Sequence, residues 1–71
     1  MPSSLISIAV NGQTQEIPEG SSISSLLERL ELQGKRIAVE MNGDIVPKSQ
    51  HAQTLLQAGA QLEIVVAVGG G

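Results

Sequence analysis

The sequence has 71 residues, enough for one small domain and too few for a second lobe with an active-site cleft between the two. It contains no Cys, one His and no Phe, Trp or Tyr. These absences exclude a disulfide framework, a thiol nucleophile, a multi-histidine metal site and an aromatic platform for stacking bases. Seven acidic against four basic residues give a net charge of −3, which favours a basic protein surface over nucleic acid as partner.

The sequence also indicates the cellular localisation of the protein. No apolar run is long enough to cross a bilayer, and the N-terminus lacks the charged and apolar regions of a signal peptide. We therefore expect a cytoplasmic protein with no membrane partner, no metal site and no bound cofactor.

The first predicted elements are two strands joined by a tight turn. Apolar residues of segment 6–10 alternate with small ones, which is typical of a strand. Asn11-Gly12 favours the positive φ angles of a hairpin turn. Segment 13–17 is more polar and is the predicted return strand, at a sheet edge and ended by Pro18.

One helix is predicted over about residues 23–31. Ser22 is a suitable N-cap, and Gly34 is the predicted C-terminal breaker. An apolar stripe with spacings of three and four residues predicts a single buried face, made of Ile23, Leu26, Leu27 and Leu30.

The second half predicts three more strands. Segment 37–41 alternates, and Asn42-Gly43 is a second hairpin signal that leads into a short partner strand at 44–46. Residues 50–53 could form a short helical turn. Segment 61–68 is the last strand, with one face made of Leu62, Ile64, Val66 and Val68.

Apolar residues on both faces near the end of the last strand indicate a central position in the sheet. The element order is β-β-α-β-β-β, with a short turn before the final strand. One apolar stripe on the helix and one apolar sheet face predict a two-layer α+β domain over residues 1–68.

Two internal features are candidates for a functional site. His51 has no neighbouring Asp or Cys, so a solvated surface side chain is favoured over a general base. Val65 and Ala67 lie on the second face of the last strand. If nothing covers that face, they would form with Ala9 and Ala38 a small apolar patch of the kind that marks interfaces, although chance exposure of small residues explains it equally well.

The most unusual feature is the terminal Gly69-Gly70-Gly71. We expect it to be a flexible tail at residues 69–71, because ordering glycine costs the most entropy. Extended, it reaches about 10 Å and carries an α-carboxylate into passages too narrow for a side chain. A frayed end or a cloning remnant is the alternative.

The segments together resemble a known family. The resemblance covers nearly the whole chain and rests on Val10-Asn11-Gly12, Ile17-Pro18-Glu19-Gly20, Ala38-Val39-Glu40-Met41-Asn42-Gly43, Val46-Pro47-Lys48-Ser49, Leu62-Glu63-Ile64-Val65 and Gly69-Gly70-Gly71. In this order they resemble the sulfur carriers of thiamine biosynthesis, the ThiS family. Two positions depart from the family pattern: Ala58-Gly59-Ala60, where an acidic-Gly-acidic turn is usual, and His51, where an aromatic residue is frequent.

The resemblance implies a β-grasp, ubiquitin-like fold and a carrier rather than an enzyme. In such a carrier a ThiF-type adenylating enzyme would use ATP to adenylate Gly71. Sulfur from a cysteine desulfurase relay would replace AMP to leave a thiocarboxylate, which donates sulfur to a ThiG-type thiazole synthase. Gly69 and Gly70 would thread partner channels, and Val65, Ala67 and Val68 are candidates for the partner surface.

Other classes stay open at this point. The small subunit of molybdopterin synthase also pairs a β-grasp fold with a Gly-Gly end, but such chains are usually longer and carry aromatics before the tail. A β-grasp regulatory module, some of which touch RNA, is disfavoured by the acidic balance. The third alternative is a structural interaction domain whose tail is incidental.

Overall fold

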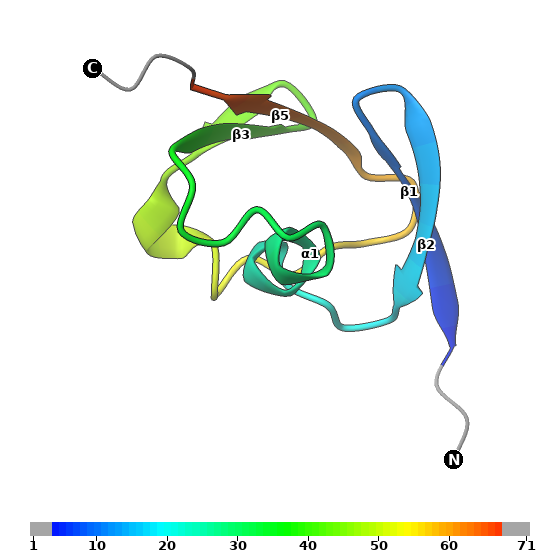
Figure 1. The fold of residues 1–71 in the computed structure, drawn as a ribbon. Helices are drawn as coiled ribbons and strands as arrows, with labels where there is room; N and C mark the ends of the chain where they lie inside the picture. Colours follow the sequence, from blue (N-terminus) through cyan, green and yellow to red (C-terminus); the bar gives the residue numbers. More distant parts are fainter. Residues whose placement is uncertain (1–3, 68–71) are drawn as a thin grey trace.

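A computed structural model describes residues 4–67, which form a mixed five-stranded sheet with one helix against one face (Figure 1). The elements in chain order are β1 (Leu5–Val10), β2 (Gln13–Pro18), α1 (Ile23–Arg29), β3 (Ile37–Met41), β4 (Asp44–Val46), the 3₁₀ turn η1 (Lys48–Gln50) and β5 (Gln61–Val66). The predicted two-layer α+β architecture is therefore confirmed. The predictions for Val68 and for residues 69–71 lie outside the described residues.

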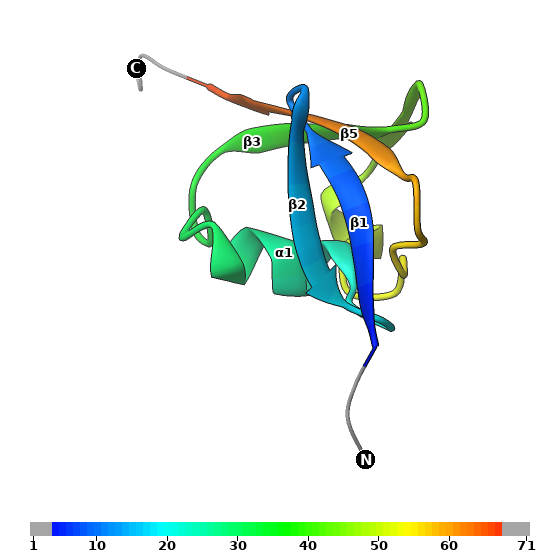
Figure 2. The same cartoon turned by 90° about the vertical axis from the view of Figure 1, so that its right-hand side faces the viewer.

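The last strand, β5, occupies the middle of the sheet, whose order is β2-β1-β5-β3-β4. It pairs in parallel with β1 through Ala9–Gln61 and Val10–Leu62, and antiparallel with β3 from Ile37–Val66 to Met41–Leu62. Figure 2 shows α1 beneath the strongly twisted sheet. The central position predicted for this strand is confirmed, and so is the edge position of β2.

Both Asn-Gly dipeptides form the predicted hairpin turns. The φ angles are +51° at Asn11 and +83° at Gly12, and +53° at Asn42 and +89° at Gly43. Positive φ at both central residues matches the right-handed twist of the flanking strands. The turns thereby fix the registers of β1 with β2 and of β3 with β4.

Helix α1 begins as predicted but ends earlier. The Oγ of Ser22 accepts a hydrogen bond from the N–H of Ser25 at 3.1 Å, as an N-cap does. The last helical residue is Arg29, two residues before the predicted end. Gly34, at φ +79°, lies in the following loop and does not end the helix, so that prediction was wrong.

The residue that ends the helix is Glu31, whose φ is +60°. Its N–H donates to the carbonyl of Glu28 at 3.0 Å, and the N–H of Leu32 donates to the carbonyl of Leu27 at 2.8 Å. These two bonds define a Schellman motif with Glu31 in the left-handed position that glycine usually fills. Leu32 is half-buried against the core, so its packing helps to hold this closure.

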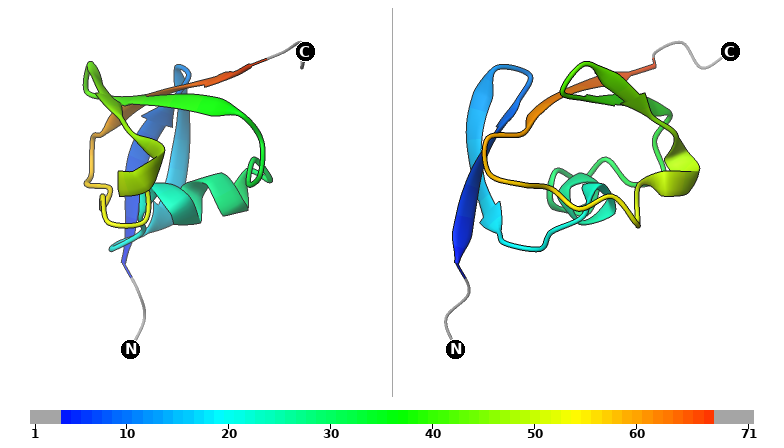
Figure 3. Two further views of the ribbon diagram at one scale, coloured as in Figure 1. Left: turned by 90° about the vertical axis from the view of Figure 1, so that its left-hand side faces the viewer. Right: turned by 180° about the vertical axis from the view of Figure 1, so that it is seen from behind.

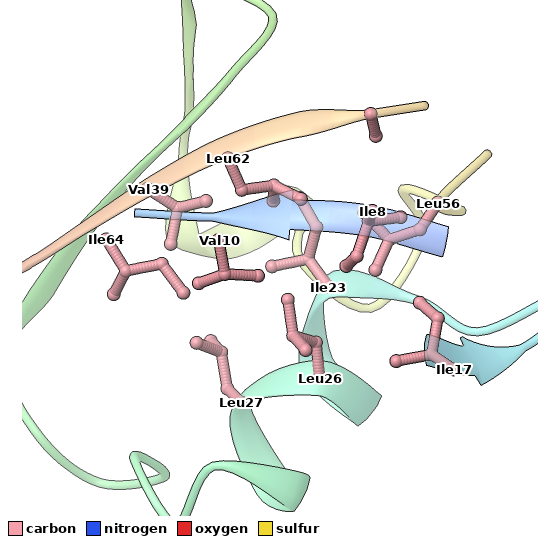
Figure 4. Close-up of a cluster of buried hydrophobic side chains, with 11 residues drawn as sticks. Ile8, Val10, Ile17, Ile23, Leu26, Leu27, Val39, Leu56, Leu62 and Ile64 are labelled. Carbon is pink, nitrogen blue, oxygen red and sulfur yellow. The ribbon is translucent and has the colours of Figure 1, made fainter. Parts of the chain in front are cut away.

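The core lies between α1 and the sheet (Figure 4). The predicted helix stripe is buried, with Ile23 at 0%, Leu26 at 1% and Leu27 at 6% exposure, and Leu30 half-buried. The sheet contributes the buried residues Ile8, Val10, Ile17, Val39, Leu62 and Ile64, and the segment before β5 adds Leu56 and Ala60.

The end of β5 departs from the prediction. Leu62 and Ile64 are buried, but Val66, on the same face, is 43% exposed. With seven residues, α1 is only about 10 Å long. The end of β5 extends away from it (Figure 1). The strand therefore leaves the core before its last residue.

Candidate functional site

The candidate site is the end of β5, from which the chain continues toward the glycine tail. Val66 pairs with Ile37 of β3, and the N–H of Ala67 donates to the carbonyl of Arg36 at 2.8 Å. Residue 67 is thus bound to the segment that leads into β3, although it lies beyond the strand itself. The backbone is therefore held through Ala67, the last residue that the structure describes.

On its other side, β5 is held by a side chain. The parallel pairing with β1 ends at Val10 and Leu62, where β1 enters its hairpin turn. The N–H of Ile64 donates to Oδ1 of Asn11 at 2.8 Å, and Nδ2 of Asn11 donates to the carbonyl of Ile64 at 3.1 Å. The amide of Asn11 therefore replaces a strand partner for Ile64. From sequence Asn11 was recognised only as a turn residue, and the role of its side chain was missed.

The outer face of the sheet exposes most of the predicted apolar patch. Val65 is 62% exposed and lies directly opposite the exposed Ala38 of β3. Ala67, beyond the strand, is also exposed. Helix α1 covers only the opposite face, so these side chains are uncovered in the described part of the chain. Their role as a partner surface stays a prediction.

Ala9 does not belong to this patch. It pairs with Gln61, four positions before Val65, which is about 13 Å along the strand. The patch extends instead toward β4, where Ile45 is 70% exposed. Ile45 pairs with Glu40, two residues after Ala38. Ile45 was not among the residues predicted for this patch, and its position on the outer face follows from its pairing with the exposed Glu40.

Two carboxylates lie side by side on the same face. Glu40 of β3 is directly opposite Glu63 of β5, and both are exposed. Like charges at directly opposite positions destabilise a sheet. No local signal predicted this pairing, because it depends on the register between two strands that are distant in sequence. The outer face thus combines apolar and acidic side chains, which suits a partner surface with basic and apolar groups.

His51 is buried, with 4% exposure, so its prediction as a solvated surface residue was wrong. Its Nε2 is 3.0 Å from the carbonyl oxygen of Val46, and only a protonated Nε2 can donate to that acceptor. Its own carbonyl accepts from the N–H of Ser24 at 3.1 Å. The residue joins η1 to β4 and α1, and the chain after β4 carries no periodic pattern that would have indicated burial.

Over residues 4–67, no cluster of three or more His, Asp or Glu side chains could hold a metal ion. Within the same range, no helix is long and apolar enough to cross a membrane. What the arrangement does provide is a firmly held strand end beside an open sheet face. A mixed five-stranded sheet with one helix packed on one face is the architecture of a β-grasp protein.

Comparison with known proteins agrees with this class. The ThiS family model matches residues 4–71. The chain is 33% identical over 64 residues to the sulfur carrier protein ThiS of Escherichia coli, which covers 90% of this chain and 97% of that protein. The crystal structure of a ThiS from Geobacter metallireducens superposes with a TM-score of 0.79 at 26% identity, over 93% of this chain and all of that one.

A longer relative is a thiazole synthase from Paramagnetospirillum magneticum, 38% identical over 64 residues. The match covers 90% of this chain but only 20% of that protein, so this chain spans a fifth of its length. The chain belongs to the ThiS family, the sulfur carriers of thiamine biosynthesis. The family resemblance and the β-grasp fold expected from sequence are both confirmed.

Proposed function

We propose that this carrier works through the carboxylate of Gly71, which is first adenylated, then converted to a thiocarboxylate and finally donates its sulfur to a thiazole synthase. A free carboxylate is a poor electrophile because its charge is delocalised and its leaving group is oxide. Attack of the carboxylate on the α-phosphorus of ATP releases pyrophosphate and supplies AMP as a good leaving group. The terminal sulfur of a persulfide on a cysteine desulfurase relay then attacks the carbonyl carbon and displaces AMP, which leaves an acyl disulfide. A thiol cleaves the S–S bond of this acyl disulfide, so that the thiocarboxylate is released and the thiols are oxidised to a disulfide.

The catalytic groups and the ATP site belong to the partners, and the chain itself is the substrate. Gly69 and Gly70 keep this segment narrow, because a residue without Cβ passes through a channel that is too narrow for side chains. The proposal also places the chain in the cytoplasm, where the adenylating enzyme has its ATP.

The observation that carries the proposal is the match to the ThiS family model, which extends through Gly71. In the described part of the chain, the strand that leads toward this residue is held by β3 and by Asn11. A thiazole synthase partner is supported by the relatives in which a segment similar to this chain forms a fifth of a protein of that name. The adenylating enzyme and the desulfurase are inferred as partners because formation of a thiocarboxylate requires an activated carboxylate and a source of sulfur.

The test is ATP–pyrophosphate exchange with a ThiF-type adenylating enzyme. Exchange should depend on the chain and should be lost when Gly71 is followed by one added Ala, since this moves the carboxylate by about 3.5 Å. A misplacement of about 1 Å already costs roughly 100-fold in rate. Exchange at the wild-type rate with the added residue would contradict a role for the Gly71 carboxylate.

A further inference from the structure

The chain concentrates its positive charge in one place. A hollow of ≈ 600 Å³ lies between α1, the loop before β3 and the turn η1. Its lining includes Lys35, Arg36 and Lys48, which are three of the four basic residues of the sequence. No carboxylate lines it among the residues that the structure describes, although the chain has seven. An acidic protein thus contains one distinctly basic depression.

The hollow has apolar walls as well as charge. Leu27, Leu32 and Ile37 line it, and so does the buried ring of His51. Its volume falls within the range of sites that enclose a small molecule or a few side chains. The three cationic residues are exposed, so their charged groups are available to a partner. The surface suits an anionic group that is carried next to an apolar one.

The hollow lies at the root of the C-terminal segment. Arg36, which lines it, accepts the hydrogen bond from Ala67 at 2.8 Å, and Ile37 pairs with Val66. Figures 1 and 3 show the loop before β3 and the end of β5 on the same side of the molecule. The hollow therefore borders Ala67, the last residue that the structure describes.

This placement limits which molecules approach the hollow. Gly71 is the fourth residue after Ala67, so an extended chain places the two about 14 Å apart at most. An enzyme whose active site holds Gly71 must come within that distance of Ala67. The rim at Arg36 and Ile37 then falls within the footprint of that enzyme.

We infer that the hollow is a docking site for an acidic segment of the adenylating enzyme, with carboxylate side chains facing Lys35, Arg36 and Lys48 and an apolar side chain packed against Leu27, Leu32 and Ile37. This inference rests on the proposed function. Because the chain as a whole is acidic, an acidic segment is attracted at this hollow and repelled by the outer sheet face with Glu40 and Glu63. The charge distribution thus sets the orientation in which the enzyme binds.

The test uses charge reversal, with a control that the chain itself supplies. Lys35→Glu and Lys48→Glu, singly and together, change exposed residues that line the hollow. Arg29→Glu makes a charge change of the same size at the one basic residue outside it, which is also exposed. Affinity for the adenylating enzyme is measured by titration at low and high salt, and thermal melting confirms that each variant is folded.

We expect the double variant to bind at least about tenfold more weakly than wild type at low salt, with a smaller difference at high salt. Arg29→Glu should stay within about twofold of wild type. Equal binding by the double variant and Arg29→Glu would overturn the docking site while leaving the proposed function intact. If the wild-type chain itself neither binds the enzyme nor supports ATP–pyrophosphate exchange, the proposed function fails and the inference fails with it.

A second measurement distinguishes a small anion from a protein segment. The isolated chain is titrated with inorganic phosphate and with AMP while the backbone amide signals of Lys35, Lys48 and His51 are followed by NMR. We expect no saturation in the millimolar range. Saturable binding below about 1 mM would assign the hollow to a small oxyanion and overturn the docking of an acidic segment.

Discussion

The side-chain amide of Asn11 holds the backbone of Ile64 through two hydrogen bonds, of 2.8 and 3.1 Å, between residues 53 positions apart. The first hairpin turn is thereby joined to the central strand just before that strand leaves the core. Asn42, at the second hairpin turn, acts similarly at the other end, because its Oδ1 accepts from the N–H of Gln61 at 3.0 Å. Both Asn-Gly turns therefore position β5 as well as reversing the chain.

Asn11→Gly tests this contact. Glycine accepts the positive φ of +51°, so the turn is preserved while both side-chain bonds are lost. We expect a loss of about 1–2 kcal/mol in the free energy of unfolding, measured by urea denaturation. Asn42→Gly is the matched control and should cost less, because it removes one exposed bond. Equal losses for the two variants would show that the Ile64 contact adds nothing to an ordinary turn.

The helix end offers a stabilising substitution. Glu31 is held at φ +60°, a conformation that costs a residue with a Cβ roughly 1–2 kcal/mol. Glu31→Gly should therefore raise the free energy of unfolding by about 0.5–1 kcal/mol, after allowance for the greater entropy of glycine in the unfolded chain. Glu28→Gly removes the same charge inside α1 and should lower stability by about 1 kcal/mol. A loss of stability in Glu31→Gly would contradict the Schellman closure.

The core is tested by two isoleucines with opposite exposure. Ile23→Ala removes a fully buried side chain and should cost about 2–5 kcal/mol. A small domain has only about 5 kcal/mol or slightly more to lose, so this variant should melt far below wild type. Ile45→Ala, at 70% exposure, should change stability by no more than about 0.5 kcal/mol. Similar melting temperatures for the two variants would show that α1 is not packed as described.

The outer sheet face is tested by Val65→Asp, at 62% exposure next to Ala38. This charge should weaken binding to the adenylating enzyme or to thiazole synthase far more than it lowers the melting temperature. Leu5→Asp places the same charge at another exposed position, 59% exposed, in the first strand and far from the end of β5. It should leave binding unchanged. Equal effects of the two substitutions on affinity would remove Val65 from the partner surface.

The features that were predictable from the sequence are those with a local cause. The Asn-Gly turns require positive φ, the stripe that includes Ile23 and Leu26 follows the helical period, and the two apolar faces near the end of β5 indicate a central strand. Each of these signals lies within a few residues of the structure that it specifies. The family resemblance added a prediction that no single element carries, namely that the β-grasp fold and the terminal glycines belong to one sulfur carrier.

The features that were missed depend on how the folded chain packs and not on the conformational preference of a single residue. Glu31 adopts a left-handed conformation because the N–H of Leu32 bonds to the carbonyl of Leu27. Glutamate has no intrinsic preference for this conformation. His51 is buried because η1 brings it to the carbonyl of Val46. The basic hollow likewise combines residues from α1, from the loop before β3 and from η1, whose proximity depends on the whole fold.

The tail itself is tested by Gly70→Val. Every buried hydrophobic residue of the described chain lies between Ile8 and Ile64, so this change should alter the unfolding free energy by less than about 0.5 kcal/mol. It should nearly abolish activation of Gly71, because the branched side chain cannot enter a channel that fits glycine. Gln57→Val, at an exposed position before β5, serves as a control for the same added apolar group. Unchanged activation of Gly70→Val in the exchange assay would contradict the channel.

The central claim is that sulfur is carried on Gly71, and intact-mass spectrometry of the chain tests it most directly. The chain is incubated with the adenylating enzyme, ATP, a cysteine desulfurase, cysteine and a thiol reductant. Its C-terminal fragment is then sequenced in the mass spectrometer. The account predicts a species in which one oxygen is replaced by sulfur, located at Gly71, dependent on ATP and lost on addition of thiazole synthase with its other substrates. An unchanged mass under these conditions, or a sulfur located at any other residue, would contradict it.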